Sequence, residues 1–180
     1  QVATCVYMFS PQLFDHLPTE PQKIHFGRTV FPQLLQSNLP LYAYHHLGYW
    51  NDIGLVDNYL QANFDLLAGK IKANIPGKPV KPGIFLEDNV FIHPQANLIA
   101  PVVIGKNCKI EAGCQIGPKA VIGRNCQISK NCSVKRSLLW ANCLLESDCQ
   151  ILDTVVARKS HLLQGQVLRN TAFRPEPKEN

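Results

Sequence analysis

Aliphatic residues recur at every sixth position through much of the chain, and mostly polar residues separate them. These anchors are Leu86, Ile92, Leu98, Ile104, Ile110, Ile116, Ile122, Ile128 and Val134. A small or apolar residue follows each anchor by four positions, giving Val90, Ala96, Val102, Cys108, Cys114, Ala120, Cys126, Cys132 and Leu138. Because a constant step returns each residue to the same place in a repeating unit, we expect both sets to point into a core.

Glycine and asparagine occupy fixed places beside these positions, as in Ile104-Gly105, Ile116-Gly117 and Ile122-Gly123. Both residue types adopt the left-handed backbone conformation of tight corners at low cost. A six-residue period with such corners predicts a left-handed parallel β-helix, in which three hexads form one triangular coil and each coil bonds to its neighbours. We expect this fold over residues 84–168.

The register of the repeat shifts by one residue after Val134. The later anchors are Leu139, Leu145, Ile151, Ala157 and Leu163, and the matching small positions are Cys143, Cys149, Val155, His161 and Val167. At three hexads per coil the repeat predicts roughly four to five coils, followed by a tail over residues 169–180.

Six of the seven cysteines occupy the small inward position, so their spacing comes from the repeat. Cysteines one hexad apart lie on different faces of a coil, which does not gather four ligands around a tetrahedral metal. We therefore expect these thiols to pack as small hydrophobic groups, without metal or disulfide. We expect the same of Cys5.

Residues 1–69 lack the six-residue period and alternate strand and helix patterns, which indicates a separate α/β unit. Strands are predicted at residues 3–9 and 41–45. A helix is predicted near residues 56–71, because Val56, Leu60, Phe64, Leu67 and Ile71 fall on one helical face and Gly69 can end it. Residues 70–83 contain three prolines and two glycines and are predicted to be an extended linker.

The composition of the chain argues against several classes of protein. No apolar run of about 18 residues or secretion signal occurs, so we expect a cytoplasmic protein without a membrane span. The net charge of +5 is spread along the chain without interleaved aromatic residues, so nucleic-acid binding is not expected. The chain starts at Gln1 with a predicted strand that no earlier segment can pair with, and we expect it to be the C-terminal part of a longer protein.

Residues 48–54, with the sequence GYWNDIG, form a loop before the predicted helix. A carboxylate at a strand-to-helix turn can bind Mg²⁺ in a cleft that holds phosphates. The alternative is that Asp52 caps a turn and Trp50 packs in the core.

Three stretches resemble the nucleoside-diphosphate-sugar pyrophosphorylases, the sugar-1-phosphate nucleotidyltransferases that include the ADP-glucose and GDP-mannose enzymes. They are VYMFSPQLFDHLP at 6–18, VFPQLLQSNLPLYAY at 30–44 and GYWNDIGLVDNYLQANFDLLAGK at 48–70. A hexapeptide β-helix directly after them has the domain order of that family. The resemblance implies that residues 1–69 are the C-terminal part of a Rossmann-like nucleotidyltransferase domain.

The resemblance also implies a reaction. The intact enzymes couple a nucleoside triphosphate to a sugar-1-phosphate with Mg²⁺ and release pyrophosphate. Asp52 matches a metal-binding acidic residue of the family, and Tyr49, Trp50 and Gly54 would shape the sugar-phosphate side of the cleft. The glycine-rich nucleotide loop, the first metal-binding Asp and the sugar-phosphate Lys of the family have no counterpart in these 180 residues. We therefore expect this chain alone to be inactive, with no catalytic residue of its own.

The sequence departs from the family at residues 26–32, where FGRTVFP lacks two expected carboxylates. This departure fits a different substrate or a catalytically weakened relative. Two other functions stay open: a non-catalytic scaffold that assembles through the β-helix, and a hexapeptide acyltransferase that uses His93 or His161. We expect a homo-oligomer, and the lysines from Lys70 to Lys81 form either a solvated linker or a site for a phosphorylated regulator.

Overall fold

The computed structural model describes residues 4–17 and 24–175. By its internal contacts the chain divides into two compact units, Gln1–Gly48 and Tyr49–Asn180.

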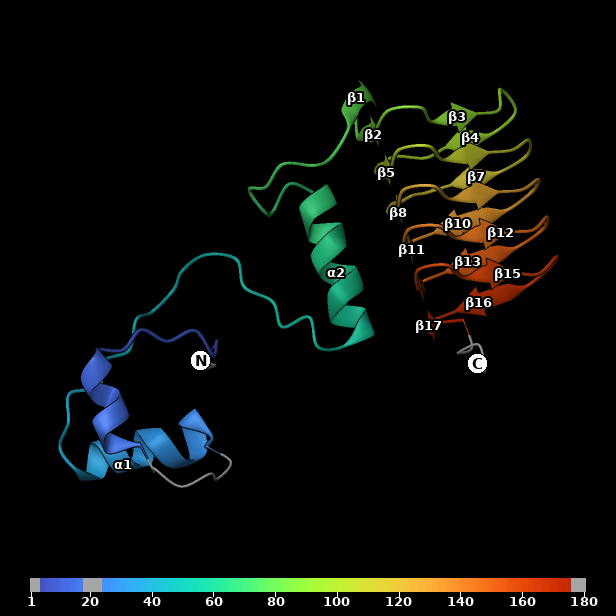
Figure 1. The fold of residues 1–180 in the computed structure, drawn as a ribbon. Coiled ribbons are helices and arrows are strands. Elements are labelled where there is room, and N and C mark those ends of the chain that lie inside the picture. Colours follow the sequence, from blue (N-terminus) through green and yellow to red (C-terminus); the bar gives the residue numbers. More distant parts are fainter. Residues whose placement is uncertain (1–3, 18–23, 176–180) are drawn as a thin grey trace. The chain divides into compact units, whose positions relative to one another are not determined.

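The second unit contains the predicted left-handed β-helix (Figure 1). Its seven-stranded sheet runs in the order β1 (Lys78–Lys81), β2 (Ile84–Leu86), β5 (Val102–Ile104), β8 (Ala120–Ile122), β11 (Leu138–Leu139), β14 (Val155–Val156) and β17 (Ala172–Phe173). One five-stranded sheet contains β16 (Val167–Arg169), β13 (Gln150–Leu152), β10 (Ser133–Lys135), β7 (Gln115–Ile116) and β4 (Asn97–Leu98). The other contains β15 (His161–Leu162), β12 (Leu144–Leu145), β9 (Gln127–Ile128), β6 (Lys109–Ile110) and β3 (Phe91–Ile92).

Strands of successive coils pair in parallel, and the length of a coil is read from the pairing. Val102 pairs with Ala120, eighteen residues later, whereas Leu138 pairs with Val155, seventeen residues later. Only β1 and β2 pair antiparallel among the described strands. Part of the predicted linker is therefore a strand that caps the first coil.

The first register shift is confirmed, because Val134 and Leu139 are both buried. A second shift follows Ile151, and the sequence prediction misses it. Val156 and Leu162 fill the core, while Leu163 is 61% exposed. The predictions of Ala157 and Leu163 as anchors, and of Leu138, Val155, His161 and Val167 as inward residues, are wrong, because Leu138 and Val155 face outward against α2.

Each register shift coincides with a corner residue in the left-handed conformation, Arg136 (φ 46°) and then Asp153 (φ 48°). At these corners the coil closes with seventeen residues in place of eighteen. The ladder also continues past residue 168, because β17 pairs with β14. Residues 176–180 of the predicted tail lie outside the described residues.

The corner residues explain two different uses of asparagine and glycine. Asn107 (φ 58°) donates from Nδ2 to Oδ1 of Asn125 on the next coil at 3.0 Å, so left-handed asparagines stack into a hydrogen-bonded column. Gly105 has no positive φ. A Cβ there would lie 2.6 Å from the backbone nitrogen of Arg124, so glycine is needed for the close approach of the next coil.

The six repeat cysteines pack in the core as predicted. They are buried, unpaired thiols that stack one coil apart, with Cys108, Cys126 and Cys143 in one column and Cys114, Cys132 and Cys149 in another. Each thiol lies near a backbone carbonyl, as Cys114 Sγ lies 3.0 Å from the oxygen of Ser129. Cys5 is exposed, so its predicted burial is wrong.

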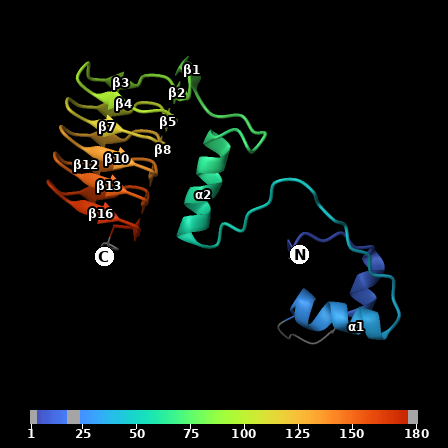
Figure 2. The same ribbon diagram turned by 180° about the vertical axis from the view of Figure 1, so that it is seen from behind.

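The predicted amphipathic helix is α2 (Val56–Leu67), which belongs to the same unit as the β-helix. Leu60 and Phe64 pack on outward-facing residues of the seven-stranded sheet, and Figures 1 and 2 show α2 lying along that sheet. Gly69 (φ 75°) follows the helix end as expected, so Ile71 lies outside the helix. The predicted domain boundaries at residues 69 and 83 stay predictions, whereas the contacts group α2 with the β-helix.

The first unit contains η1 (Pro11–His16), η2 (Phe26–Val30) and α1 (Phe31–Gln36) around the buried residues Leu13, Val30 and Leu34. The strands predicted at residues 3–9 and 41–45 do not form where the structure describes these segments. A strand needs a hydrogen-bonded neighbour, and the described residues of this unit contain no other strand to serve as one. Met8, for example, is 97% exposed. In the described part of the chain, no helix is long and apolar enough to cross a membrane.

Thiol reactivity tests the packing of the core. In the native chain we expect only Cys5 to react with an aromatic disulfide reagent, because the other six thiols are buried. The six should react together as the chain unfolds in denaturant. A Cys5→Ser variant should lose the fast reaction, and fast labelling of several thiols in that variant would contradict the buried columns.

Candidate functional site

The loop over residues 49–55 lies along α2 and is attached to it at two levels. Near the C-terminal end of α2, the Tyr49 hydroxyl donates to Asp65 Oδ2 at 3.0 Å. Near its N-terminal end, Asn51 Nδ2 donates to the backbone oxygen of Asn58 at 3.3 Å. The loop therefore runs antiparallel to α2 before it turns into the helix at Val56.

These attachments use a different face of α2 from the one that packs on the β-helix. Asn58, Gln61 and Asp65 follow the spacing of one helical face. Leu60 and Phe64, four residues apart, form the neighbouring apolar stripe. The sequence of α2 thus gives one face to the sheet and another to the loop.

Asp65 is the central polar group of this attachment, and the sequence prediction missed it. It is only 7% exposed and accepts hydrogen bonds from Tyr49 and from Gln61 Nε2, the latter at 2.9 Å. Lys70 Nζ lies 2.8 Å from Oδ1. The Lys70 ammonium lowers the pKa of the Asp65 carboxyl, the hydrogen bonds from Tyr49 and Gln61 act in the same direction, and burial opposes them. Asp65 in turn raises the pKa of Lys70.

A signal for Asp65 was present in the sequence. It is a carboxylate within the apolar run Phe64-Asp65-Leu66-Leu67, and Lys70 follows just beyond the helix end. A buried carboxylate needs a cation and hydrogen-bond donors, so this pattern predicts a paired site. Lys70 therefore pairs with the helix end while its side chain stays largely exposed, and the predicted linker from residue 70 stays a prediction.

Asp52 is exposed and closes a tight turn. Its Oδ1 accepts a hydrogen bond from the Gly54 amide at 3.1 Å, and a Cβ on Gly54 would lie 3.2 Å from that oxygen. The turn expected in the alternative interpretation is thus present. Trp50 is 45% exposed, so the core packing that the same interpretation expects of Trp50 is absent.

The chemistry of the loop suits a magnesium site to which the protein contributes one ligand, Asp52. No group of three or more His, Cys, Asp or Glu side chains converges anywhere in residues 4–17 and 24–175. Mg²⁺ commonly uses only one or two carboxylates and completes its shell with water and substrate phosphates. Asp52 Oδ2 accepts no hydrogen bond from the described residues and remains available for such a role. The roles of Tyr49, Trp50, Asp52 and Gly54 stay predictions.

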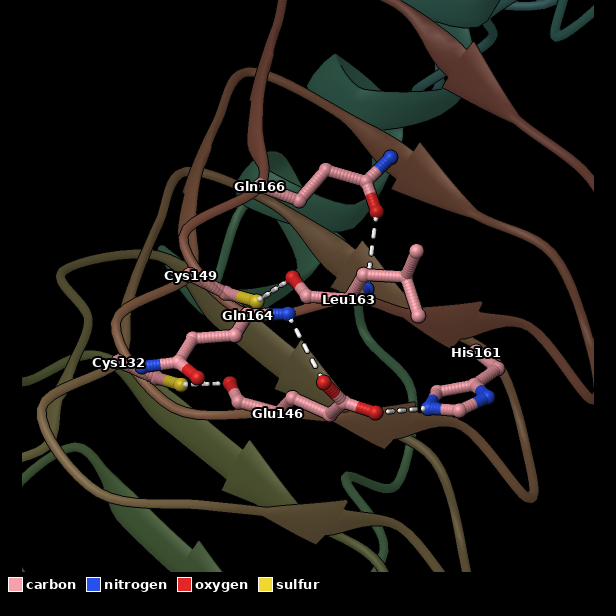
Figure 3. A network of polar contacts seen from close by, with 7 residues as sticks. All are labelled: Cys132, Glu146, Cys149, His161, Leu163, Gln164 and Gln166. Carbon is pink, nitrogen blue, oxygen red and sulfur yellow. Dashed lines mark hydrogen bonds and ion pairs between the residues drawn. The ribbon is translucent and has the colours of Figure 1, made fainter.

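The two candidate histidines of an acyltransferase lie in polar contacts at the surface. His161 Nε2 lies 2.8 Å from Glu146 Oε1, and Glu146 Oε2 accepts the Gln164 amide at 3.0 Å (Figure 3). His93 Nδ1 accepts the amide of Gln95 at 3.1 Å, as in a local turn. Both arrangements link backbone and side chains of the coils.

A shallow hollow of about 790 Å³ lies beside β1 and the first coils. Its lining includes Lys78, Lys106 and Arg124 together with Glu87 and Asp88. Lys78 Nζ lies 3.9 Å from Asp88 Oδ1, and Glu87 accepts the Lys106 amide. The hollow therefore has mixed charge, and none of the four predicted site residues lines it.

Two family models match the chain. The nucleotidyl transferase model matches residues 1–69, which agrees with the α/β class expected for this part. The model of the EIF2B subunit epsilon LbH domain matches residues 81–173, more than half of the chain. The order of the two matches is the order expected from the sequence.

Several curated proteins are similar to the chain. A UTP–glucose-1-phosphate uridylyltransferase from Synechocystis sp. is 37% identical over 121 residues, which are 66% of this chain and 31% of that protein. A glucose-1-phosphate adenylyltransferase from Clostridium novyi is 31% identical over 56% of this chain and 30% of its own length. A mannose-1-phosphate guanylyltransferase from Mycobacterium tuberculosis is 26% identical over 64% and 32%. The chain spans less than a third of each of these relatives.

Among solved structures, a perosamine N-acetyltransferase from Caulobacter crescentus in complex with CoA and GDP-perosamine gives a TM-score of 0.39 at 16% identity. The similarity covers 83% of this chain and 73% of that one.

The Asp65 attachment predicts a pH dependence. Because the pKa of Asp65 is below its ordinary value of 3.8, the ionised carboxyl stabilises the fold above that pH and the stabilisation is lost as the pH falls. Asp65→Asn should lower the free energy of unfolding at neutral pH, and the difference from wild type should shrink below about pH 4. Urea unfolding from pH 3 to 7 measures it, with Asp57→Asn as an exposed control. A difference that stays constant to about pH 3 would contradict the ion pair.

Proposed function

The chain belongs to the family of the EIF2B subunit epsilon LbH domain, and from this premise we propose that it is the C-terminal part of a sugar-1-phosphate nucleotidyltransferase. Support comes from the nucleotidyl transferase match ahead of the β-helix and from relatives named as uridylyl-, adenylyl- and guanylyltransferases of sugar phosphates. A longer protein would supply the nucleotide-binding loop that these 180 residues lack.

The proposed reaction joins a nucleoside triphosphate to a sugar-1-phosphate. A phosphate oxygen of the sugar-1-phosphate forms a bond to the α-phosphorus, the bond from that phosphorus to the bridging oxygen of the β-phosphate breaks, and pyrophosphate leaves. Bound Mg²⁺ would supply neutralisation of the phosphate charge. In this chain Asp52 would bind the metal with its carboxylate, and Tyr49, Trp50 and Gly54 would border the sugar phosphate.

One observation carries the proposal: the Asp52 turn lies on a loop that is attached to α2 at both Asp65 and Asn58. Placement of a metal ligand contributes to catalysis only when the ligand is held in position before the substrate binds. Asp52 lies between the attached Asn51 and the start of α2 at Val56, so the chain is held on both sides of it. The exposed carboxylate of Asp52 is then available to a metal and a phosphate on the solvent side.

A non-catalytic scaffold is the second proposal, and the segment at residues 26–32 favours it. The Phe26 ring stacks on Phe9 at 5.1 Å and packs near Phe31, so this segment is built from aromatic contacts where the family resemblance implies two carboxylates. In either function we propose a cytoplasmic homo-oligomer that assembles through the β-helix. The surface position of His161, away from the hollow, gives no support to acyl transfer.

Substitution of Asp52 tests the enzymatic function. The longer protein should be expressed from the coding sequence that includes the region upstream of Gln1, and pyrophosphate release assayed with Mg²⁺ and a panel of nucleoside triphosphates and sugar-1-phosphates. Asp52→Asn should lower kcat on the order of 100-fold, because the metal loses a charged ligand. Asp57→Asn, an exposed carboxylate in the first turn of α2, is the matched control and should keep activity. Wild-type protein without turnover on any pair would favour the scaffold.

A further inference from the structure

We propose that the β-helix keeps the loop at residues 49–54 in shape by holding α2 in helical form, with Phe64 and Asp65 as the positioning residues. The proposal rests on the proposed function only in its kinetic readout. Its structural readout applies to the chain whatever reaction it serves.

The docking side of α2 is centred on Phe64. Its side chain is 3% exposed and packs with Leu60 against Leu138 and Val155, with Val121 beside them. These three sheet residues are outward-facing ladder partners on β8, β11 and β14. An apolar row on three successive coils therefore faces a single helix.

Two cations of the β-helix also contact the Phe64 ring. Lys119 Nζ and Arg136 Cζ each lie 5.4 Å from its centroid. Both residues occupy left-handed corners on neighbouring coils, and Arg136 is held by Asp153 at 2.6 Å. A cation over a desolvated aromatic ring is more favourable than one over an exposed ring, so these contacts mark Phe64 as the anchor of the helix.

The loop depends on the helix rather than on the sheet directly. Its two attachment points, Asn58 and Asp65, are seven residues apart, and only the helical conformation keeps them in register. α2 has 12 residues, and a helix of about this length is marginal in water without tertiary contacts. Loss of docking at Phe64 should therefore unwind α2 and release Tyr49 from Asp65, although neither Tyr49 nor Asp65 belongs to the apolar cluster.

The chain contains two tryptophans, which give two indole N–H signals in a ¹H–¹⁵N spectrum. Trp140→Phe assigns the signal of Trp50, which lies in the loop. Truncation of the buried ring in Phe64→Ala should shift the docking equilibrium about 100-fold towards the displaced helix. The Trp50 signal should then move to the position that it takes in Asp65→Ala, where the loop attachment is cut directly.

Phe91→Ala is the matched control. Phe91 also lies under a cation, Lys109 at 6.0 Å, but it is exposed on a sheet that α2 does not cover. This variant should leave the Trp50 signal in place. A Trp50 signal that stays unmoved in Phe64→Ala, or that moves equally in Phe64→Ala and Phe91→Ala, would overturn the proposal.

If Phe64→Ala does not fold, the cations provide a milder test. Lys119→Met and Arg136→Met should each accelerate hydrogen exchange of the Phe64 amide about fivefold relative to Lys109→Met, because each removes one cation from the ring. Equal exchange in all three variants would count against docking through Phe64.

In the longer protein, Phe64→Ala should lower kcat/KM for the sugar-1-phosphate on the order of 10-fold or more, with KM for the nucleoside triphosphate unchanged. Phe91→Ala should have no such effect. Inactivity of the wild type would count against the proposed function, and the Trp50 result would still decide whether the β-helix positions the loop.

Discussion

The contact between α2 and the outward-facing row of the seven-stranded sheet is the interaction on which the rest of the second unit depends. The coils support one another through parallel ladders and stacked aliphatic residues, so they need no helix to close the core. α2 is too short to persist alone, and it becomes stable where Val121, Leu138 and Val155 accept Leu60 and Phe64. The polar loop then packs on the neighbouring polar face of the same helix. Each level of structure thus supplies the support for the next.

The β-helix could be predicted from the sequence because its inward positions repeat locally. The first register shift was visible for the same reason, since a clear series resumes at Leu139. The second shift was hidden, because apolar residues stand next to each other in Val155-Val156 and Leu162-Leu163 and either member could face inward. Ladder pairing with the preceding coil decides between them, and that pairing is not local in sequence. Val155 is buried nonetheless, against α2 on the outer side.

The candidate site could be found from its motif but not constructed from it. The GYWNDIG pattern predicted a loop before a helix, and the turn between Asp52 and Gly54 is present. Asp65 was missed because its importance comes from Tyr49, sixteen residues earlier, and from a lysine beyond the helix end. The strands predicted in the first unit failed for a related reason. An extended apolar segment becomes a strand only beside a partner, and local pattern does not show whether one is there.

Native-state hydrogen exchange of the wild-type chain tests the central contact most directly, because it measures the free energy at which each amide opens. If α2 is held by the β-helix, the amides at its centre should open together with a free energy of about 2 kcal/mol or more, because a helix of this length is marginal when it is undocked. Exchange of these amides at nearly the rate of an unfolded chain would contradict the account, since docking on the sheet would then give the helix no stability.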